Sequence, residues 1–421
     1  MLKRLMIATA IGALFAGQAA ADTTLRLTEV ITSPERTKTL RKIVDNFEKE
    51  NAGVKVEITS LPWGQAFEKF ATMVSAGNTP DVVEMPDRWQ SLYASSGRLE
   101  DLGPYLDKWD ETKKINNLTM KMAKVVGDKA YSLPYGFYLR ALFYNKKLFK
   151  QAGIDGPPKT LTEFKQDAEK ISKLPGKYGY CLRGGPGGYG GWLMLGASMA
   201  KSGDFFHKDG TSTLADSGWV DGYQFLIDLY KNGNAPKDSV NWGFNEVVAG
   251  FYSGTCAMLD QDPDALIGIA DRMDSEDYGV APFPTGPGGN RYPTLGYAGW
   301  AMFANSDHKD LAWKLIAALD GPKGNLMWNK QTGTLPIYNS LKSDPFYQKQ
   351  GYKAWFEELA SDKTKPLVFP FRLKEFGFFS DSLVPKTSQK ALLGDITAKE
   401  LGEQWAAFMT KANKASETSA N

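Results

Sequence analysis

The stretch VKVEITSLPWGQAFEKFATMVSAGNTPDVVEM, residues Val54–Met85, decides the fold class. Its first part, Val54–Ser60, has β-branched residues at alternating positions, which predicts a strand. Ala66–Ala76 predicts a helix that stops before Gly77. Asp81–Met85 is short and largely apolar, as expected for a strand that is buried on both faces. A strand, a helix and a further strand in this order form the repeating unit of an α/β lobe.

The same alternation extends on both sides of this stretch. Thr24–Val30 predicts an earlier strand, and Pro34–Asn51 predicts a helix whose apolar residues share one face. Beyond the middle, Tyr178–Leu182 and Thr255–Leu259 predict strands, with a helix over Val220–Asn232. Roughly 400 residues are too many for one ordinary core. The sequence therefore predicts two doubly wound α/β lobes.

The N-terminus has the pattern of an export signal. Lys3 and Arg4 precede the apolar run Leu5–Ala16, and the small residues Ala19–Ala21 follow before Asp22. This pattern predicts a secretory signal peptide that is cleaved after Ala21, and hence a periplasmic protein. The apolar run is shorter than the about 20 residues of a membrane anchor.

The charge balance argues against nucleic acid as a partner. Of 50 basic and 48 acidic residues, the signal removes Lys3 and Arg4, which leaves 48 of each sign. Binding to phosphates depends on clustered Lys and Arg, and a neutral chain gives no sign of such clustering.

The only two cysteines, Cys181 and Cys256, both lie in segments predicted to be strands. Neighbouring parallel strands rarely present the geometry of a disulfide. Two buried thiols are therefore expected in preference to a bridge, although an oxidising compartment leaves the bridge open.

Enzyme chemistry has little support in the sequence. There are two histidines, His207 and His308, in polar contexts, which gives no His-rich metal site and no Ser-His-Asp triad. A carboxylate pair such as Asp260 and Asp262 leaves a glycosidase open. The glycine-rich segment Gly184–Gly191 lacks the Lys-Ser/Thr of a phosphate-binding loop. We expect neither a cofactor nor a metal, and a protein that is not an enzyme.

Several short motifs occur in a characteristic order along nearly the whole mature chain. They are Gly77–Val83, Gly97–Leu102, Tyr131–Pro134, Phe143–Lys146, Ala152–Ile154, Phe251–Met258, Tyr278–Thr285 and Gly333–Pro336. Together they resemble the carbohydrate-binding proteins of bacterial ATP-binding-cassette (ABC) importers, the family that includes maltose-binding proteins.

This resemblance implies the type II fold of periplasmic binding proteins, with two lobes that close around a ligand by hinge motion. The implied lobes are 22–135 with 282–340, and 136–281 with 341–410. A flexible tail is expected over 411–421, because it is polar and small. The implied partners are a carbohydrate and the permease subunits of an ABC importer, and the protein is expected to be a monomer.

The resemblance also implies site residues. Asp87 and Arg88 match an acid-base pair that binds sugar hydroxyls, although Asp87 could instead cap the following helix. Tyr138, Glu84 and Asp264 depart from the maltose pattern, which argues against maltodextrin. Two aromatic residues of that pattern, Tyr189 and Trp192, are retained.

The remaining candidates lie where predicted strands end or in loops, the places at which open α/β sheets bind ligands. Trp300 is expected to stack on a sugar or to lie in the core, and Arg372 to meet a carboxylate or an anionic ligand. A charged solute, such as a sugar acid, polyamine or opine, is the alternative to a sugar. The complete set of expected ligand-binding residues is Thr32, Ser33, Trp63, Gln65, Asp87, Arg88, Tyr138, Tyr189, Trp242, Asp262, Tyr297, Trp300 and Arg372.

Overall fold

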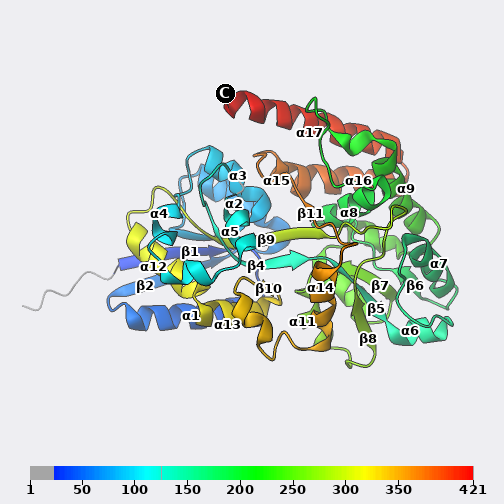
Figure 1. Ribbon diagram of the computed structural model, residues 1–421, viewed down its shortest axis with the longest axis horizontal. Coiled ribbons are helices and arrows are strands. Elements are labelled where there is room, and N and C mark those ends of the chain that lie inside the picture. The colour runs from blue at the N-terminus through cyan, green and yellow to red at the C-terminus, as the bar shows by residue number, and fades with distance from the viewer. Residues whose placement is uncertain (1–22, 125, 421) are drawn as a thin grey trace, which may run out of the picture.

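The structure is a computed structural model that describes residues 23–124 and 126–420. Two separate sheets, each covered by helices, lie side by side along the long axis of the molecule (Figure 1). This arrangement confirms the predicted pair of α/β lobes. The predicted signal peptide and its cleavage site lie outside the described residues.

The first sheet has the order β10-β4-β9-β3-β1-β2, and β11 also pairs with β9. Strands β1, β2 and β3 are parallel, whereas β9 runs antiparallel to both β3 and β4. The strands of this sheet are β1 Thr23–Glu29, β2 Val54–Ser60, β3 Val82–Pro86, β4 Leu133–Leu139, β9 Thr294–Met302, β10 Leu335–Pro336 and β11 Leu367–Val368.

The helices associated with this sheet come from the first third of the chain and from residues after β9. They are α1 Pro34–Glu50, α2 Trp63–Ser75, α3 Asp87–Ser95, α4 Gly103–Leu106, α5 Asn117–Ala123, α12 Lys309–Asp320 and α13 Pro322–Thr332, with the short turns η1 Asp110–Lys114 and η4 Asn339–Ser343. The apolar residues Leu40, Ile43, Val44 and Phe47 of α1 are buried, as their spacing predicts.

The second sheet has the order β6-β7-β5-β8. Its strands are β5 Ala141–Asn145, β6 Tyr178–Tyr180, β7 Cys256–Gln261 and β8 Tyr278–Ala281. Most of the remaining helices surround it or each other: α6 Lys146–Gln151, α7 Leu161–Ile171, α8 Tyr189–Ala200, α9 Ser217–Lys231, α10 Phe244–Tyr252, α11 Ala265–Ala270, α14 Gln350–Ala360, α16 Val384–Leu393 and α17 Ala398–Ala420, with the turns η2 Thr213–Ala215 and η3 Lys237–Asn241.

The chain changes sheet at places that differ from the predicted ones. β4 continues to pair with β9 as far as Leu139, so the first crossing lies at Arg140 and not at Tyr135–Gly136. Residues after Ala281 remain on the second lobe, because the N–H of Thr285 donates to Lys159 O at 2.9 Å. The second crossing comes just before β9, where the N–H of Arg140 donates to Thr294 O at 3.2 Å.

Gly136, at the predicted lobe boundary, has a packing role in β4. A Cβ at this position would lie 2.4 Å from Oγ1 of Thr334, on the segment that leads into β10. The glycine therefore allows a close approach between β4 and the segment before β10.

The expected pair of free thiols is wrong, because Cys181 and Cys256 form a disulfide with their Cα atoms 5.4 Å apart. Cys256 begins β7, but Cys181 lies directly after the end of β6. The N–H of Cys181 still donates to Met258 O of β7 at 2.8 Å, so the two segments lie side by side, and the prediction underestimated how close the two cysteines come.

The C-terminal region is helical where a flexible tail was expected. The helix α17 runs through 411–420, and Ala412 and Asn413 are buried. The short helix α15, Phe376–Phe378, and the π-helical turn η5, Phe379–Leu383, precede α16. α15 contacts α3, so this segment reaches back to the first lobe.

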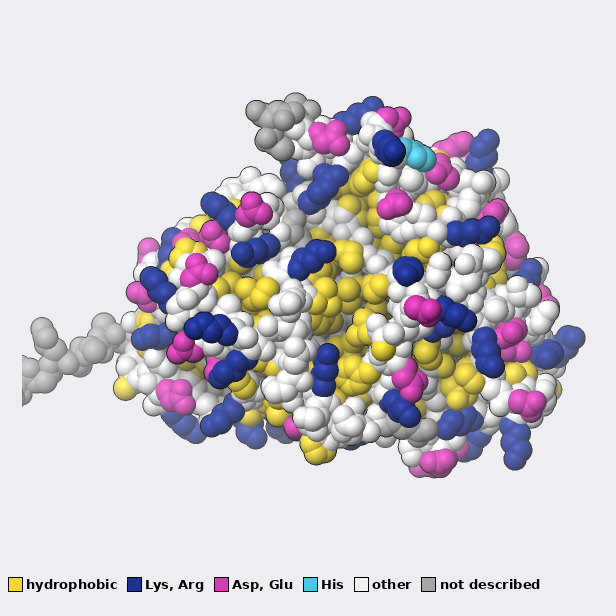
Figure 2. Space-filling view, in the orientation of Figure 1, with side chains coloured by type: hydrophobic (Ala, Val, Ile, Leu, Met, Phe, Trp, Pro, Cys, Tyr) yellow, Lys and Arg dark blue, Asp and Glu magenta, His cyan; other side chains and the backbone are white. Residues whose placement is uncertain are grey.

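The view in Figure 2 shows apolar side chains gathered in the middle of the face drawn, between two ends that carry most of the charged groups. Among the described residues, no helix is long and apolar enough to cross a membrane.

Candidate ligand-binding cleft

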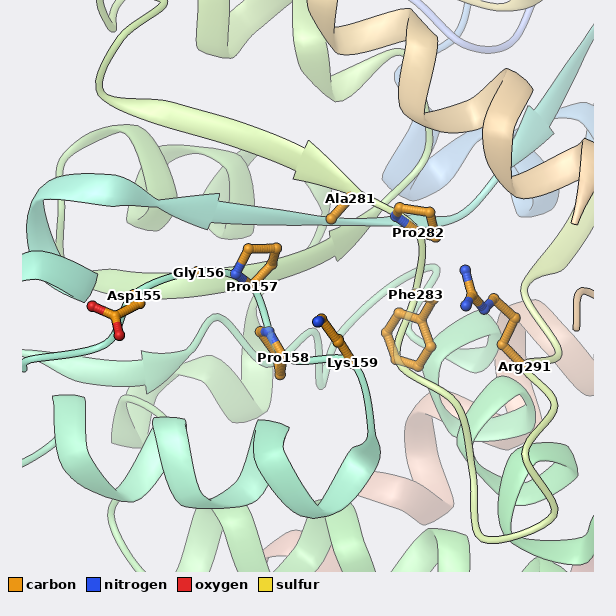
Figure 3. A pocket seen from close by; sticks show the side chains of 9 residues that line it. All are labelled: Asp155, Gly156, Pro157, Pro158, Lys159, Ala281, Pro282, Phe283 and Arg291. Carbon is orange, nitrogen blue, oxygen red and sulfur yellow. The ribbon is translucent and has the colours of Figure 1, made fainter.

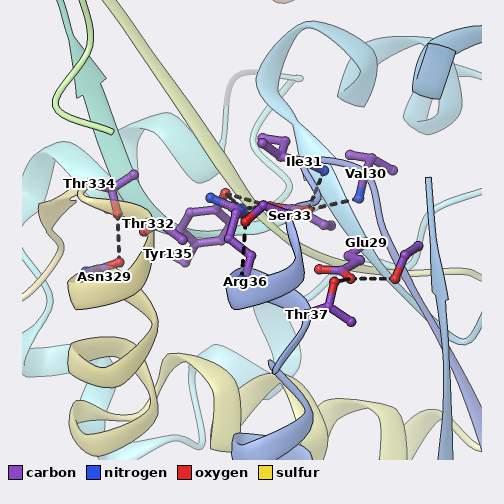
Figure 4. A network of polar contacts seen from close by, with 12 residues as sticks. Glu29, Val30, Ile31, Ser33, Arg36, Thr37, Tyr135, Asn329, Thr332 and Thr334 are labelled. Atoms are coloured by element: carbon purple, nitrogen blue, oxygen red, sulfur yellow. Dashed lines mark hydrogen bonds and ion pairs between the residues drawn. The ribbon is translucent and has the colours of Figure 1, made fainter. Parts of the chain in front are cut away.

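The first polar network of the site lies at the carboxyl ends of β1 and β3. Glu84 of β3 is fully buried, and its Oε2 accepts from the N–H groups of Val30 and Ile31 at 2.9 and 3.0 Å. Its Oε1 accepts from Arg36 at 2.7 Å and from the hydroxyl of Tyr135 at 2.7 Å. Figure 4 shows these two donors close together, with Val30 and Ile31. The carboxylate of Glu84 therefore has protein partners on both oxygens.

Tyr138 extends this network towards the second lobe. Its hydroxyl lies 2.9 Å from the hydroxyl of Tyr135, and burial raises its pKa. The guanidinium of Arg36 also lies 4.8 Å from the ring centre of Trp328. Arg36 is not among the residues predicted from the sequence, although its position in the first turn of α1, close to the end of β1, was a usable signal.

Helix α3 begins with Asp87 and Arg88, directly after β3. Asp87 is buried, and its Oδ1 and Oδ2 accept from the N–H groups of Arg88 and Tyr297 at 2.7 and 2.8 Å. Burial raises the pKa of Asp87 to about 7, although Arg88 acts in the opposite direction. Asp87 therefore holds β9 against α3, and it does not cap the helix in the expected way, because the cap residue is Pro86.

Arg88 lies between aromatic rings of both lobes. Its Nε donates to both carboxylate oxygens of Asp381 at 3.1 and 2.9 Å, and Trp89 donates to the same carboxylate at 2.7 Å. The guanidinium lies 4.6 Å from the ring centre of Trp63 and 5.4 Å from that of Tyr189. Asp381 belongs to η5, nearly 300 residues further along the chain, and nothing in the sequence indicated it.

The second polar cluster belongs to the second lobe. Asp260 at the end of β7 pairs with Arg140 and accepts from the hydroxyl of Tyr180. Asp262 and Asp264 follow, and neither forms an ion pair among the described residues. Oδ1 of Asp264 is buried without a hydrogen-bond partner.

Burial and mutual repulsion act on these carboxyl groups. Burial first, and then Asp262, raises the pKa of Asp264 to about 7, while Arg36 and Arg183 oppose the shift. Burial also raises the pKa of Asp262 against the pull of Arg140 and Arg183. Arg36 of the first network therefore acts electrostatically on Asp264 of the second cluster.

Arg183 completes this cluster. Its Nε donates to Pro186 O at 2.7 Å, and it forms no ion pair among the described residues. Burial lowers its pKa to about 10, with Arg140 acting in the same direction. Next to it, Gly190 has its backbone so close to Arg140 that a Cβ would lie 2.8 Å from Nη2. The glycine-rich segment therefore allows the close approach of backbone that its composition predicts.

The structure thus brings five of the expected residues to this region. The rings of Trp63 and Tyr189 both lie near the guanidinium of Arg88, while Tyr138 is near enough to Asp264, the neighbour of Asp262, for that carboxylate to raise its pKa. At the edge, the Oγ of Ser33 accepts from Arg36 N as the cap of α1. Thr32 and Gln65 lie nearby in the sequence and have no side-chain hydrogen bond among the described residues.

Four other expected residues have different surroundings. Tyr297 and Trp300 lie within β9, not at a strand end, and both are buried: Tyr297 donates to Gln90 at 2.8 Å, and Trp300 packs against Trp328. The ring of Trp242 packs against Gly250 of α10. Arg372 donates to Asn413 and Ser416 of α17. All four side chains have protein neighbours, and the expectation that they bind a ligand stays a prediction.

Trp192, the second aromatic residue of the glycine-rich region, is also a core residue. It is buried against Tyr223 and Trp405. Of the two aromatic residues retained from the maltose pattern, only Tyr189 contacts a group of the first lobe.

The sequence matches the family described as bacterial extracellular solute-binding protein over residues 32–326, which is more than half of the chain. The chain belongs to this family. A putative binding protein of Brucella abortus is 30% identical over 326 residues, which cover 77% of this chain and 78% of the relative. The galactooligosaccharide-binding protein of Bacillus subtilis is 26% identical over 325 residues, or 75% of this solute-binding protein and 73% of the relative.

Solved structures agree on the fold of this solute-binding protein. The GacH receptor of Streptomyces glaucescens has a TM-score of 0.81 at 23% identity, covering 93% of this chain and 99% of the receptor. Maltose-bound MalE3 of T. maritima has a TM-score of 0.81 at 24% identity, covering 92% and 99%. At this identity the likeness shows the fold, and it confirms the expected type II periplasmic binding architecture.

Proposed function

We propose that this solute-binding protein captures a sugar or polyol between its two lobes and delivers it to the membrane subunits of an ABC importer. The observation that carries the proposal is the second-lobe cluster of Arg183, Asp262 and Asp264, which faces Tyr138 without ion pairs of its own. Hydroxyl groups donate and accept, so a polyol satisfies such a mixed set of donors and acceptors.

Aromatic groups at the same place support a sugar in particular. Trp63 comes from the first lobe and Tyr189 from the second, and both rings lie near Arg88. Flat apolar rings suit the C–H faces of a sugar. Named relatives include a galactooligosaccharide-binding protein and a diacetylchitobiose-binding protein, and one solved neighbour holds ribitol.

The sheet assignment supports a modified division into lobes. We assign residues 23–139 and 294–343 to the first lobe, and 141–292 with 350–410 to the second, except that the segment 367–383 contacts the first. Closure then turns about Arg140 and about the segment before Thr294.

The family is one of binding proteins, and we further propose that this member has no catalytic activity, acts as a monomer in the periplasm, and is cleaved after Ala21. Mass spectrometry of the exported protein tests the cleavage site. Size-exclusion chromatography with light scattering tests the monomer.

Calorimetric titration with monosaccharides, disaccharides to tetrasaccharides, polyols and sugar acids tests the ligand. A saturable 1:1 complex with a neutral saccharide or polyol is expected. Binding only to amino acids or peptides would overturn the proposal, and release of product from a glycoside would show an enzyme instead.

A cationic ligand, such as an amino sugar or a polyamine, is the second candidate. Two unpaired carboxyl groups, Asp262 and Asp264, stand against one unpaired guanidinium, that of Arg183. Binding that strengthens from pH 6 to pH 8 for an amine, with no such change for a neutral sugar, distinguishes the two.

A further inference from the structure

A pocket of about 520 Å³ opens on the second lobe, beside the segment that follows β8 (Figure 3). Pro157, Pro282 and the ring of Phe283 form much of its lining. Two basic side chains, Lys159 and Arg291, lie on either side of that ring (Figure 3). None of these five residues belongs to the cleft described above, so the pocket is a separate feature.

Arg291 has no ion-pair or hydrogen-bond partner for its guanidinium among the described residues, although the carboxyl group of Glu358 opposes the effect of burial on its pKa. Its side chain is half-buried, its Nε is buried without a hydrogen-bond partner, and it forms no ion pair among the described residues. Burial lowers its pKa. Lys159, on the rim, has neither an ion pair nor a side-chain hydrogen bond within the described part of the chain. A guanidinium removed from water without an acceptor is costly, and a bound anion removes that cost.

Three carboxyl groups are near this pocket, and none forms an ion pair with Arg291 among the described residues: Glu163, which accepts from Lys159 N at 2.6 Å, Glu358 and Asp155. Glu358 of α14 is buried and accepts from Phe283 N at 2.9 Å. Burial raises the pKa of Glu358 to about 8, so at neutral pH it is mostly uncharged. Asp155 lies at the other end of the pocket, and its carboxylate points away from Lys159 and Arg291 (Figure 3).

We propose that this pocket is a second binding site, which takes a small organic anion. A carboxylate or phosphate group pairs with Arg291 and Lys159, and an apolar body lies against Phe283 and the neighbouring prolines. A guanidinium suits this role because its parallel N–H groups match the two oxygens of a carboxylate or phosphate.

Titration of the mature protein with benzoate, phenyl phosphate and benzamide at low ionic strength, followed by NMR, tests this site. Benzoate and phenyl phosphate are expected to bind, and the neutral isostere benzamide about tenfold more weakly or not at all. Comparison of the two anions shows whether carboxylate or phosphate is preferred. Arg291→Met should weaken benzoate binding by about tenfold, whereas Lys363→Met, an equal change of charge at an exposed neighbour, should not.

Equal binding of benzamide and benzoate would overturn the proposal, because it would show an apolar crevice alone. Unchanged benzoate affinity in Arg291→Met would overturn it as well. If that variant does not fold, Lys159→Met on the exposed rim replaces it, and unchanged affinity there has the same meaning. Arg183→Met in the cleft should leave benzoate binding intact; loss of binding in this variant would place the anion between the lobes and overturn the second site.

Discussion

The two polar regions that face each other between the lobes are organised in different ways. In the first lobe, Glu84 has partners on both carboxylate oxygens, and Arg36 is its ion-pair partner at 2.7 Å. In the second lobe, Arg183, Asp262 and Asp264 have no ion pairs among the described residues. The polar groups of the first region are paired with one another and stabilise the fold. Those of the second region have donors and acceptors that remain available to a ligand. We expect substitutions in the first to affect folding and those in the second to affect binding.

The largest effect is expected for Glu84→Ala. The variant leaves the guanidinium of Arg36 buried without its carboxylate and frees the N–H groups of Val30 and Ile31, so we expect a loss of about 3–5 kcal/mol of unfolding free energy. Urea unfolding measures it. Glu100→Ala, which breaks a half-buried pair with Lys309, is the control and should cost about 1 kcal/mol or less. Equal losses in the two variants would remove the distinction between scaffold and surface.

Asp262→Asn should give the largest effect on binding. Because no side chain pairs with Asp262, the variant should fold normally, and loss of a charged acceptor should weaken sugar affinity by about 2–3 kcal/mol. Calorimetry with the best ligand of the screen measures this change, and Asp271→Asn, at an exposed position of the same lobe, is the control. An unchanged affinity together with a lowered melting temperature would assign Asp262 to the scaffold.

Many elements of the two lobes could be predicted from the sequence. The strand-helix alternation of Val54–Met85 was predicted, and Trp63, Arg88 and Tyr189 meet as expected residues of two lobes. The alternation was predictable because strands and helices of α/β lobes are local features, which patterns of a few residues can locate, whereas the ligand-binding role of these three residues stays a prediction.

The errors have a common physical origin in pairing between distant segments. Gly296–Trp300 contains the turn-forming and aromatic residues of a loop, but it lies within β9, which is paired on both sides by β3 and β4. Asp381 reaches Arg88 from nearly 300 residues away. The disulfide depends on where β6 ends, which periodicity does not define to one residue.

A smaller effect is expected from the pH dependence of stability. The pKa of Asp264 is about 7 in the folded protein, above its ordinary value of 3.8, so the folded state retains this proton longer than the unfolded state. Its contribution to stability is therefore complete below about pH 4 and is lost as the pH rises through about 7.

Asp264→Asn, a neutral isostere, should flatten this slope and gain about 1–2 kcal/mol at pH 8. Unfolding in urea between pH 4 and pH 8 measures it, again with Asp271→Asn as the control. Parallel curves for Asp264→Asn and the unmodified protein would show that Asp264 is not held in its neutral form by the fold.

The smallest change is expected in the radius of gyration when the two lobes close and bring the two polar regions together. Arg88 of the first lobe lies 5.4 Å from the ring centre of Tyr189 of the second, so the lobes are in contact in this structure. A ligand stabilises that arrangement only if it contacts both lobes, because otherwise it has no preference between open and closed forms. Small-angle scattering should therefore show a smaller radius of gyration with saturating ligand than without it. The Asp262→Asn variant, at the same ligand concentration, should stay at the larger value. An unchanged radius of gyration, with binding confirmed in the same sample, would mean that the lobes are already closed in the free protein. The ligand would then bind the unpaired groups of the second lobe without any hinge motion.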